Sequence, residues 1–317
     1  MIAIGVDIGG TSIKGAAITR EGEVLDVFSM PVEKGDGQDD VLARLADTIN
    51  AYLKEHGYNK DNVLGIGFGI PGSIDTKNGV VSYSNNLKWY DVPFVKYMEE
   101  KTGLPVRITN DANAAAYGEA KFGAGKKYKN ILMFTLGTGV GGGIIVDGKL
   151  YEGNMGKGAE MGHAVIVVDG EQCSCGRKGC LEAYASATAL IRETNKMMEA
   201  HKDSKMWEIS EKLGKVDARV AFEAARAGDK YGEELVNNYV KYLGEGLMNY
   251  FNIFRPEVVV LSGGIANERE YLNSRLRKYC EERHYGYQCT PKVEIVTSEI
   301  GYHSGKIGAA ALFFDFD

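Results

Sequence analysis

The feature that most constrains the fold of this 317-residue chain is a strand–glycine turn–strand pattern that occurs twice. The first copy spans residues 2–19 and turns at Asp7-Ile-Gly-Gly-Thr11. The second spans 131–146 and turns at the glycines of 137–143. Further strand and helix patterns follow each copy. Because the pattern recurs once and not at a short period, it predicts two related α/β domains rather than a solenoid.

Apolar spacing predicts the remaining elements. Three strand-like segments in the first thirty residues, joined by short turns, predict an antiparallel meander. The break between the domains is expected near 109–125, which gives a small α/β domain at 1–115 and a large α/β domain at 116–302. The strands are predicted at 2–6, 13–19, 23–29, 63–68, 106–109, 131–135, 143–146, 258–261 and 292–296, and the helices at 41–56, 93–101, 112–121, between 181 and 254, and after Gly305.

Composition excludes several classes of protein. The net charge of -6 argues against nucleic acid or an anionic membrane surface as the main partner. The longest apolar runs are far shorter than the roughly 20 residues of a membrane span, and the first residues lack the basic segment of a signal peptide. The five cysteines do not form the dense, even-numbered set of a secreted disulfide framework, so a reducing, cytoplasmic location is expected.

The glycine turns point to phosphate binding, although the common nucleotide motifs are missing. No Gly-Lys pair is followed by Ser or Thr, so there is no Walker A loop, and neither G-x-G-x-x-G match, at 67–72 and 137–142, runs directly into a helix. Either turn alone would be explained by ordinary hairpin geometry. Two such turns in a duplicated chain favour anion binding by backbone N–H groups. The candidate nucleotide-binding residues in and beside these two turns are Asp7, Gly9, Gly10, Thr11, Lys14, Gly137, Thr138 and Gly139, with Asp7 facing Mg²⁺.

Asn110 and Asp111 stand where a predicted strand becomes a helix, near the predicted domain break. Phosphoryl transfer to an alcohol uses a carboxylate to accept the hydroxyl proton, and Asp111 is the candidate for that base. The alternative is a helix N-cap, for which Asn and Asp are favoured residue types. The two roles partly conflict, because N–H groups bonded to a carboxylate stabilise its ionised form and weaken it as a base.

One His and three Cys lie within 18 positions, at His163, Cys173, Cys175 and Cys180. A Cys₃His set is typical of closed, structural zinc sites, and the alternative is three free thiols in a surface loop. Glu160 and Glu182 flank this segment. Their carboxylates and the second ring nitrogen of His163 are suited to gripping sugar hydroxyls, although solvated surface acids are the commoner state of Glu.

Together these segments resemble the ROK family (repressors, open reading frames and kinases) over essentially the whole chain. The two glycine turns resemble the phosphate segments of actin-like sugar kinases. Ser262-Gly-Gly264 resembles their adenosine segment, which implies that Gly263 and Gly264 also bind the nucleotide. The zinc segment is the most diagnostic part. The motifs that carry the resemblance are Asp7-Ile-Gly-Gly-Thr11, Asn110-Asp111, Leu136-Gly-Thr-Gly-Val-Gly-Gly-Gly143, Glu160-x-Gly-His163, Cys173-x-Cys175-Gly-x-x-Gly-Cys180-x-Glu182 and Ser262-Gly-Gly264.

The resemblance implies a two-domain actin-like ATPase (ribonuclease H-like) α/β fold, with a C-terminal helix at about 303–317 that returns to the first domain. It implies an ATP-dependent hexokinase with MgATP and a hexose as partners, in which Asp111 activates the C6 hydroxyl of glucose and a structural Zn²⁺ shapes the sugar site. The implied sugar ligands are Gly72, Asn110, Asp111, Glu160, His163 and Glu182, with the loop 86–89 nearby. Family members are commonly dimers or tetramers.

The same motifs leave other activities open. Kinases of N-acetylmannosamine, N-acetylglucosamine or fructose share them, and the choice depends on the pocket around C2 of the sugar. The family's transcriptional repressors carry a helix-turn-helix before the first strand, whereas this sequence starts that strand at Ile2 and is acidic. A non-catalytic sugar sensor is disfavoured by the presence of Asp111 and both glycine turns.

Overall fold

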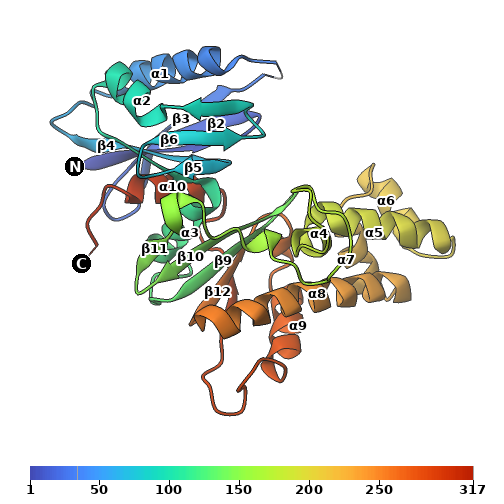
Figure 1. Cartoon of the computed structure of the whole chain (residues 1–317). Helices are drawn as coiled ribbons and strands as arrows, with labels where there is room; N and C mark the ends of the chain where they lie inside the picture. The colour runs from blue at the N-terminus through green and yellow to red at the C-terminus, as the bar shows by residue number, and fades with distance from the viewer. Residues whose placement is uncertain (34, 317) are drawn as a thin grey trace. The chain divides into compact units, whose positions relative to one another are not determined.

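A computed structural model describes residues 1–33 and 35–316. Contacts along the chain group the residues into two compact units (Figure 1). The first unit comprises 1–129, 143–159 and the C-terminal segment from 299; the second comprises 130–142 and 160–298. The predicted boundary between 115 and 116 lies inside a helix of the first unit, so this grouping does not follow it. The domain division at that position stays a prediction.

The first unit is built on a five-stranded sheet of order β3-β2-β1-β4-β8. The predicted meander is confirmed, because β1 pairs antiparallel with β2, and β2 with β3. β4 and β8 then add in parallel to β1. The register places Asp7 of β1 directly opposite Lys14 of β2. The strands are β1 (Ile2–Ile8), β2 (Ser12–Ile18), β3 (Val24–Pro31), β4 (Val63–Ile70) and β8 (Val106–Asn110).

Helices cover both faces of this sheet, as Figure 1 shows. One face packs its apolar side chains, among them Ile4 and Phe68, against α1 (Gln38–Glu55) and α2 (Phe94–Thr102). The other face carries α3 (Asp111–Phe122) and α10 (Ser304–Ala311). The backbones of β4 and α10 approach each other so closely that a Cβ at Gly67 would lie 1.8 Å from the carbonyl oxygen of Ala309. Glycine is therefore needed for this helix–sheet contact.

A small antiparallel sheet of order β5-β6-β7 also belongs to the first unit. Its strands are β5 (Ser73–Asp75), β6 (Val80–Ser84) and β7 (Trp89–Val92). β5 directly follows the first G-x-G-x-x-G match, at 67–72, so a strand and not a helix comes after it, as expected. The side chains of Leu87 and Trp89 are buried in the core of this unit. In the loop 86–89, which the resemblance placed near the sugar, these two apolar side chains therefore serve packing.

The second sheet has the order β11-β10-β9-β12-β13. β12 pairs in parallel with both β9 and β13. β10 begins at Val140 and not at Gly143, so the glycine turn is only three residues long (137–139) and the following glycines are strand residues. The strands are β9 (Ile131–Leu136), β10 (Val140–Val146), β11 (Lys149–Tyr151), β12 (Val258–Ser262) and β13 (Glu294–Thr297).

The remaining helices belong to the second unit. The longest, α8, is capped by Asp229, whose side chain accepts hydrogen bonds from the N–H groups of Tyr231 and Gly232. Asp217 lies one residue before the cap position of α7, and its carboxylate accepts from Arg219 N at 2.9 Å. The helices are α4 (Glu182–Ala185), α5 (Ala187–Ala200), α6 (Met206–Leu213), α7 (Arg219–Arg226), α8 (Lys230–Phe254) and α9 (Glu270–Glu281).

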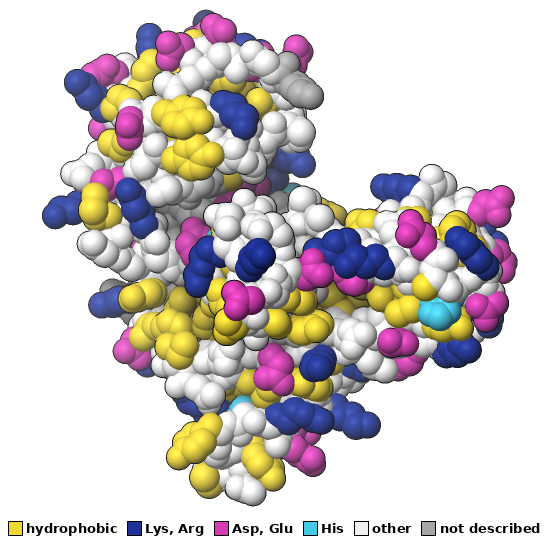
Figure 2. Space-filling view, turned by 45° about the vertical axis from the view of Figure 1, so that its right-hand side comes forward, with side chains coloured by type: hydrophobic (Ala, Val, Ile, Leu, Met, Phe, Trp, Pro, Cys, Tyr) yellow, Lys and Arg dark blue, Asp and Glu magenta, His cyan; other side chains and the backbone are white. Residues whose placement is uncertain are grey.

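Short 3₁₀ turns complete the chain: η1 (Asn154–Gly156), η2 (Met161–His163), η3 (Ile265–Glu268) and η4 (Gly301–His303). Among the described residues no helix combines the length and the apolar character that a membrane span needs. On the face drawn in Figure 2, basic and acidic side chains are interspersed.

Candidate functional site

The first glycine turn joins β1 to β2 and carries five of the candidate nucleotide-binding residues. Gly9 N donates to Ser12 O at 3.0 Å, and a Cβ at Gly9 would lie 2.8 Å from that same oxygen. The turn is therefore too tight for a side chain at position 9. Gly10 and Thr11 at its tip are exposed, and Lys14 is exposed on β2. This arrangement leaves backbone N–H groups and an ammonium available to an anion.

Asp7 lies at the end of β1, just before this turn. Burial and the nearby Asp111 carboxylate raise the pKa of Asp7 from its usual 3.8 to about 6, against the lowering effect of Lys306 and Lys14. No described residue donates a hydrogen bond to its carboxylate oxygens. Two hard oxygen donors without protein partners fit Mg²⁺, held directly or through water.

Asn110 is the N-cap of α3, so the capping role that was the alternative for Asp111 belongs to its neighbour. Its side-chain oxygen accepts from Ala112 N at 2.9 Å and Asn113 N at 3.4 Å, which caps α3. Its amide nitrogen donates to Gly72 O at 3.2 Å. Gly72 has φ +124, and a Cβ there would lie 2.2 Å from Tyr83 O, so only glycine fits. The structure thus brings two predicted sugar ligands together through a contact that fixes the Asn110 amide.

Asp111 is consequently the first residue of α3 and not its cap. Its Oδ1 accepts from Ala112 N at 2.9 Å. Burial raises the pKa of Asp111, although the Ala112 N–H and the Asn110 side chain act in the opposite direction. A raised pKa brings a carboxylate closer to the range in which it accepts a proton readily. The conflict between cap and base is thereby reduced, because the neighbouring amide does the capping.

The second glycine turn joins β9 to β10 in the second unit. Gly137 N donates to Gly139 O at 3.0 Å, and the start of α5 holds the turn through Ala187 N to Gly137 O and the Thr188 hydroxyl to Thr138 O, both at 2.8 Å. Another predicted nucleotide residue, Gly263, lies against the same strand end: with φ +89, its Cβ would be 2.5 Å from Leu136 O. Gly264 has open space on its Cβ side. The structure therefore groups the candidates at 137–139 and 263–264.

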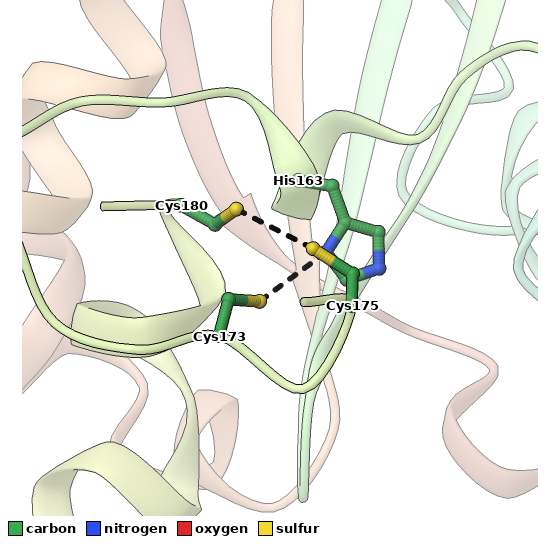
Figure 3. A group of neighbouring side chains, drawn as sticks. All are labelled: His163, Cys173, Cys175 and Cys180. Atoms are coloured by element: carbon green, nitrogen blue, oxygen red, sulfur yellow. Dashed lines mark hydrogen bonds between the residues drawn. The ribbon is translucent and has the colours of Figure 1, made fainter. Parts of the chain in front are cut away.

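The four predicted metal ligands converge on one point (Figure 3). One ligand atom from each of His163, Cys173, Cys175 and Cys180 lies within 4.8 Å of the others. Cys173 Sγ is 3.6 Å from His163 Nδ1, and the Sγ atoms of Cys175 and Cys180 are 3.7 Å apart. In a tetrahedral zinc site with ordinary bond lengths the corresponding edges are about 3.6 and about 3.8 Å. The donor set and both spacings fit zinc, and the 3.7 Å separation is too long for a disulfide.

Glu160 and Glu182 flank the segment that carries the four predicted metal ligands. His163 turns Nδ1 toward the sulfurs, and Figure 3 shows its other ring nitrogen pointing away from them. Glu182, at the start of α4, accepts from Val140 N at 3.0 Å through Oε2 and from the Ser174 hydroxyl at 2.7 Å through Oε1. Glu160 is exposed, and its carbonyl accepts from His163 N at 3.1 Å. Glu182 therefore links the loop that carries the four predicted metal ligands (163–180) to the second glycine turn.

Two polar residues in these surroundings were not singled out from the sequence. Ser174 lies between two cysteines, and nothing in its spacing marked it as the partner of Glu182. Lys306 lies on α10, where only 7% of its surface is exposed, close enough to Asp7 to act on its carboxylate. A signal for Lys306 was present: it is the one charged residue in the run of small and apolar residues from Ser304 to Ala311.

Comparisons with known proteins agree on the family of this chain. The family model described as "ROK family" matches residues 3–315. A glucokinase of Halalkalibacterium halodurans is 37% identical over 314 residues, which are 98% of this chain and 94% of that protein. The crystal structure of a ROK family glucokinase from Streptomyces griseus in complex with glucose and AMPPNP superposes with a TM-score of 0.81 at 32% identity, covering 98% of this chain and 99% of that one.

Transcriptional regulators also match. The xylose repressor of Bacillus subtilis is 31% identical over 315 residues, which are 99% of this chain and 77% of the repressor. Similarity of sequence therefore extends to kinases and to repressors, and the residues at the site have to distinguish the two activities.

Proposed function

This chain belongs to the ROK family, and we propose that it transfers the γ-phosphate of ATP to the C6 hydroxyl of glucose, with Asp111 as general base. It has the actin-like ATPase (ribonuclease H-like) α/β fold that the resemblance implied. Its general activity is that of an ATP-dependent sugar kinase. Glucose is the proposed acceptor because a relative that aligns over nearly its whole length is a glucokinase.

The observation that carries the kinase proposal is the pair of half-buried carboxylates, Asp7 and Asp111, in the first unit. Each has a raised pKa, and Asp111 contributes to the shift at Asp7. Two carboxylates brought this close repel each other, and such repulsion costs stability unless cations or a proton compensate it. A site that receives Mg²⁺ and an alcohol proton supplies both forms of compensation, whereas a purely sugar-binding protein needs neither.

Asp111 and Asp7 have different roles in the proposed reaction. As the C6 oxygen of the sugar attacks the γ-phosphorus, the Asp111 carboxylate takes the hydroxyl proton, and the bond from the γ-phosphorus to the bridging oxygen breaks to release ADP. Asp7 would hold Mg²⁺, which when bound neutralises charge on the phosphate oxygens. The turn at Gly9 presents the N–H groups of Gly10 and Thr11, which with the Lys14 ammonium are proposed to orient the phosphates. Residues 137–139 and 263–264 of the second unit are proposed to contact the nucleotide as well.

The zinc loop is proposed to shape the sugar site. Zinc would be held by Nδ1 of His163 and the three sulfurs, and with four protein ligands it has no open position for catalysis. A metal on Nδ1 fixes Nε2 as the nitrogen available to a sugar hydroxyl. Glu160 and Glu182 are the proposed carboxylate partners of the hydroxyls, with Asn110 and Gly72 on the first unit. The chain is expected to form a homodimer or homotetramer, which sedimentation analysis would test.

The decisive experiment compares Asp111→Asn with the wild-type enzyme in an assay of ADP release. The variant is expected to lose roughly 10²–10⁴-fold in kcat with KM for ATP changed less than threefold, because the amide keeps the shape but accepts no proton. Because the pKa of Asp111 is raised, wild-type kcat is expected to fall as the pH drops through that pKa. Near wild-type turnover by Asp111→Asn would contradict the base assignment.

The acceptor is tested by offering glucose, mannose, N-acetylglucosamine, N-acetylmannosamine and fructose to the wild-type enzyme. The highest kcat/KM is expected for glucose. A preference for another hexose would leave the kinase in place and change its substrate. Sugar binding without ADP release on any of the five would favour a sensor, the reading that similarity to xylose repressors keeps open.

A further inference from the structure

We propose that Lys306 binds the phosphate chain of the nucleotide, as a second cation beside Lys14. The inference rests on the proposed kinase function and deepens it by adding a residue from the C-terminal helix to the nucleotide site. It rests on the position and the burial of this lysine and on its lack of a partner among the described residues.

The position of Lys306 follows from the contact between α10 and β1. A Cβ on Gly5 would lie 1.8 Å from the carbonyl oxygen of Lys306, so the helix backbone touches the strand two residues before Asp7. A Cβ on Gly305 would lie 3.0–3.2 Å from the carboxyl atoms of Asp7. Lys306 therefore follows the residue that touches Asp7, at the end of β1 where the first glycine turn begins.

The burial of Lys306 is unusual for a lysine. Only 7% of the residue is exposed, and every other residue of α10 is also buried. Among the described residues none forms an ion pair within 4.0 Å of its ammonium group, and none accepts a hydrogen bond from it. Lysine is almost never fully buried unless it is paired. The packing of α10 requires small or apolar residues, so it does not explain a long cation at this position.

The charges around Lys306 explain why a cation occupies this buried position. Burial lowers the pKa of Lys306, Asp7 opposes that shift, and Lys14 adds to it. Lys306 and Lys14 therefore act on each other and on the same carboxylate, beside a turn with exposed backbone N–H groups. When Asp7 is engaged by Mg²⁺, both ammonium groups lose part of their attraction to it. The phosphate oxygens of a nucleoside triphosphate then provide the missing anionic partner.

The closing experiment measures nucleotide binding and does not depend on turnover. Lys306→Met keeps the length of the side chain and removes its charge, whereas Lys306→Arg keeps the charge. Lys54→Met, on the exposed face of α1, is the matched control for loss of one positive charge. Calorimetric titration with a non-hydrolysable ATP analogue and Mg²⁺ measures the affinity for the whole nucleotide. Competition by adenosine measures the affinity for the nucleoside without phosphates.

Lys306→Met is expected to weaken binding of the analogue at least tenfold while changing adenosine binding less than twofold. Lys306→Arg is expected to recover most of the affinity, and Lys54→Met to match wild type. The melting temperature of Lys306→Met should equal or exceed that of wild type, because an apolar side chain suits the buried position better. Loss of affinity then cannot be attributed to unfolding.

Two results would overturn the inference. Equal weakening of analogue and adenosine binding by Lys306→Met would assign the lysine a packing role, and unchanged binding of both would remove it from the site. Failure of the proposed function gives a different pattern. In that case wild-type protein binds the analogue through Lys306 but phosphorylates no hexose. A wild-type protein that binds no analogue would contradict both proposals.

Discussion

The Glu182 carboxylate accepts a hydrogen bond from the backbone N–H of Val140 at 3.0 Å. Val140 is the first residue of β10, directly after the second glycine turn, and Glu182 closes the metal-binding segment. The same carboxylate also accepts from the Ser174 hydroxyl inside the zinc loop. A single side chain therefore joins the segment proposed to contact the nucleotide to the segment proposed to contact the sugar, within one compact unit.

Replacing Glu182 with Gln tests this connection. Gln has one acceptor oxygen and one NH₂ donor, so if the oxygen keeps the Val140 N–H, the bond to the Ser174 hydroxyl has to reverse its direction, and the carboxylate charge is lost. We expect KM for the hexose to rise by about tenfold and kcat to fall less, because a positioning contact is lost and the proton acceptor remains. Steady-state kinetics measure both values. Glu211→Gln, exposed on α6, is the control, and an unchanged KM in Glu182→Gln would show that the link is dispensable.

Metal content tests the Cys₃His cluster. Purified wild-type protein is expected to contain about one zinc per chain by elemental analysis, since four protein ligands close the site. Cys175→Ser should lose that zinc and melt at a lower temperature, because structural zinc contributes binding free energy to folding. Cys289→Ser is the matched control, because Cys289 is also exposed but lies outside the cluster. Wild-type protein that is fully active and free of metal would refute a structural zinc.

Asp7 is expected to reduce stability at neutral pH. Its pKa is raised in the folded state to about 6 from the usual 3.8, so the folded protein binds the proton more tightly than the unfolded chain does. The ionised form therefore costs folding free energy, from nothing below pH 3.8 to at most about 3 kcal/mol above pH 6. Asp7→Asn removes the charge and should raise the melting temperature at pH 7.5 in buffer without Mg²⁺ or nucleotide.

The difference between Asp7→Asn and wild type should shrink as the pH falls from 6 toward 4, which thermal melts at several pH values would follow. Asp61→Asn, in an exposed turn, controls for the loss of one acidic group. The same Asp7→Asn variant should lose kinase activity if Asp7 faces Mg²⁺. A variant that is less stable than wild type at pH 7.5 would contradict the unfavourable burial of this carboxylate.

Glu119 is expected to be essential for the stability of the first unit. It is fully buried in α3, and its carboxylate accepts from Ala124 N at 2.9 Å, Ile300 N at 3.0 Å and Glu299 N at 3.2 Å. These bonds tie the end of α3 to the segment that leads into α10. Glu119→Ala would remove the acceptor of three backbone N–H groups and should lower the free energy of unfolding by about 2–4 kcal/mol. Denaturant melts measure the loss, and Glu100→Ala, exposed on α2, should change it little.

Local sequence was sufficient wherever the residues of a feature are close in the chain. The meander of the first three strands, the helix that follows Asn110 and the convergence of His163 with three cysteines were all predicted from spacing. In each case a short connection leaves the backbone few ways to bring the residues together. The length of the second glycine turn was predicted less well, because glycine in a paired strand looks the same in a sequence as glycine in a turn.

Contacts between distant segments could not be predicted in this way. The capping role that was the alternative for Asp111 was decided by the fixed carbonyl of Gly72, to which the Asn110 amide also bonds. Ser174 became significant only because the start of α4 places Glu182 beside it. Lys306 was overlooked because a lysine on a short helix is ordinarily solvated, and only packing against β1 shows that this one is buried.

The sequence by itself determined the family, the α/β order of the elements and the types of side chain present for phosphate, metal and proton chemistry. These properties depend on residue type and short spacing, which are written along the chain. Only the tertiary structure decided the charge environment of Asp7 and the burial of Lys306. Such electrostatic effects depend on distance and solvent exclusion, and both arise when α10, some 300 residues away in the sequence, packs against β1.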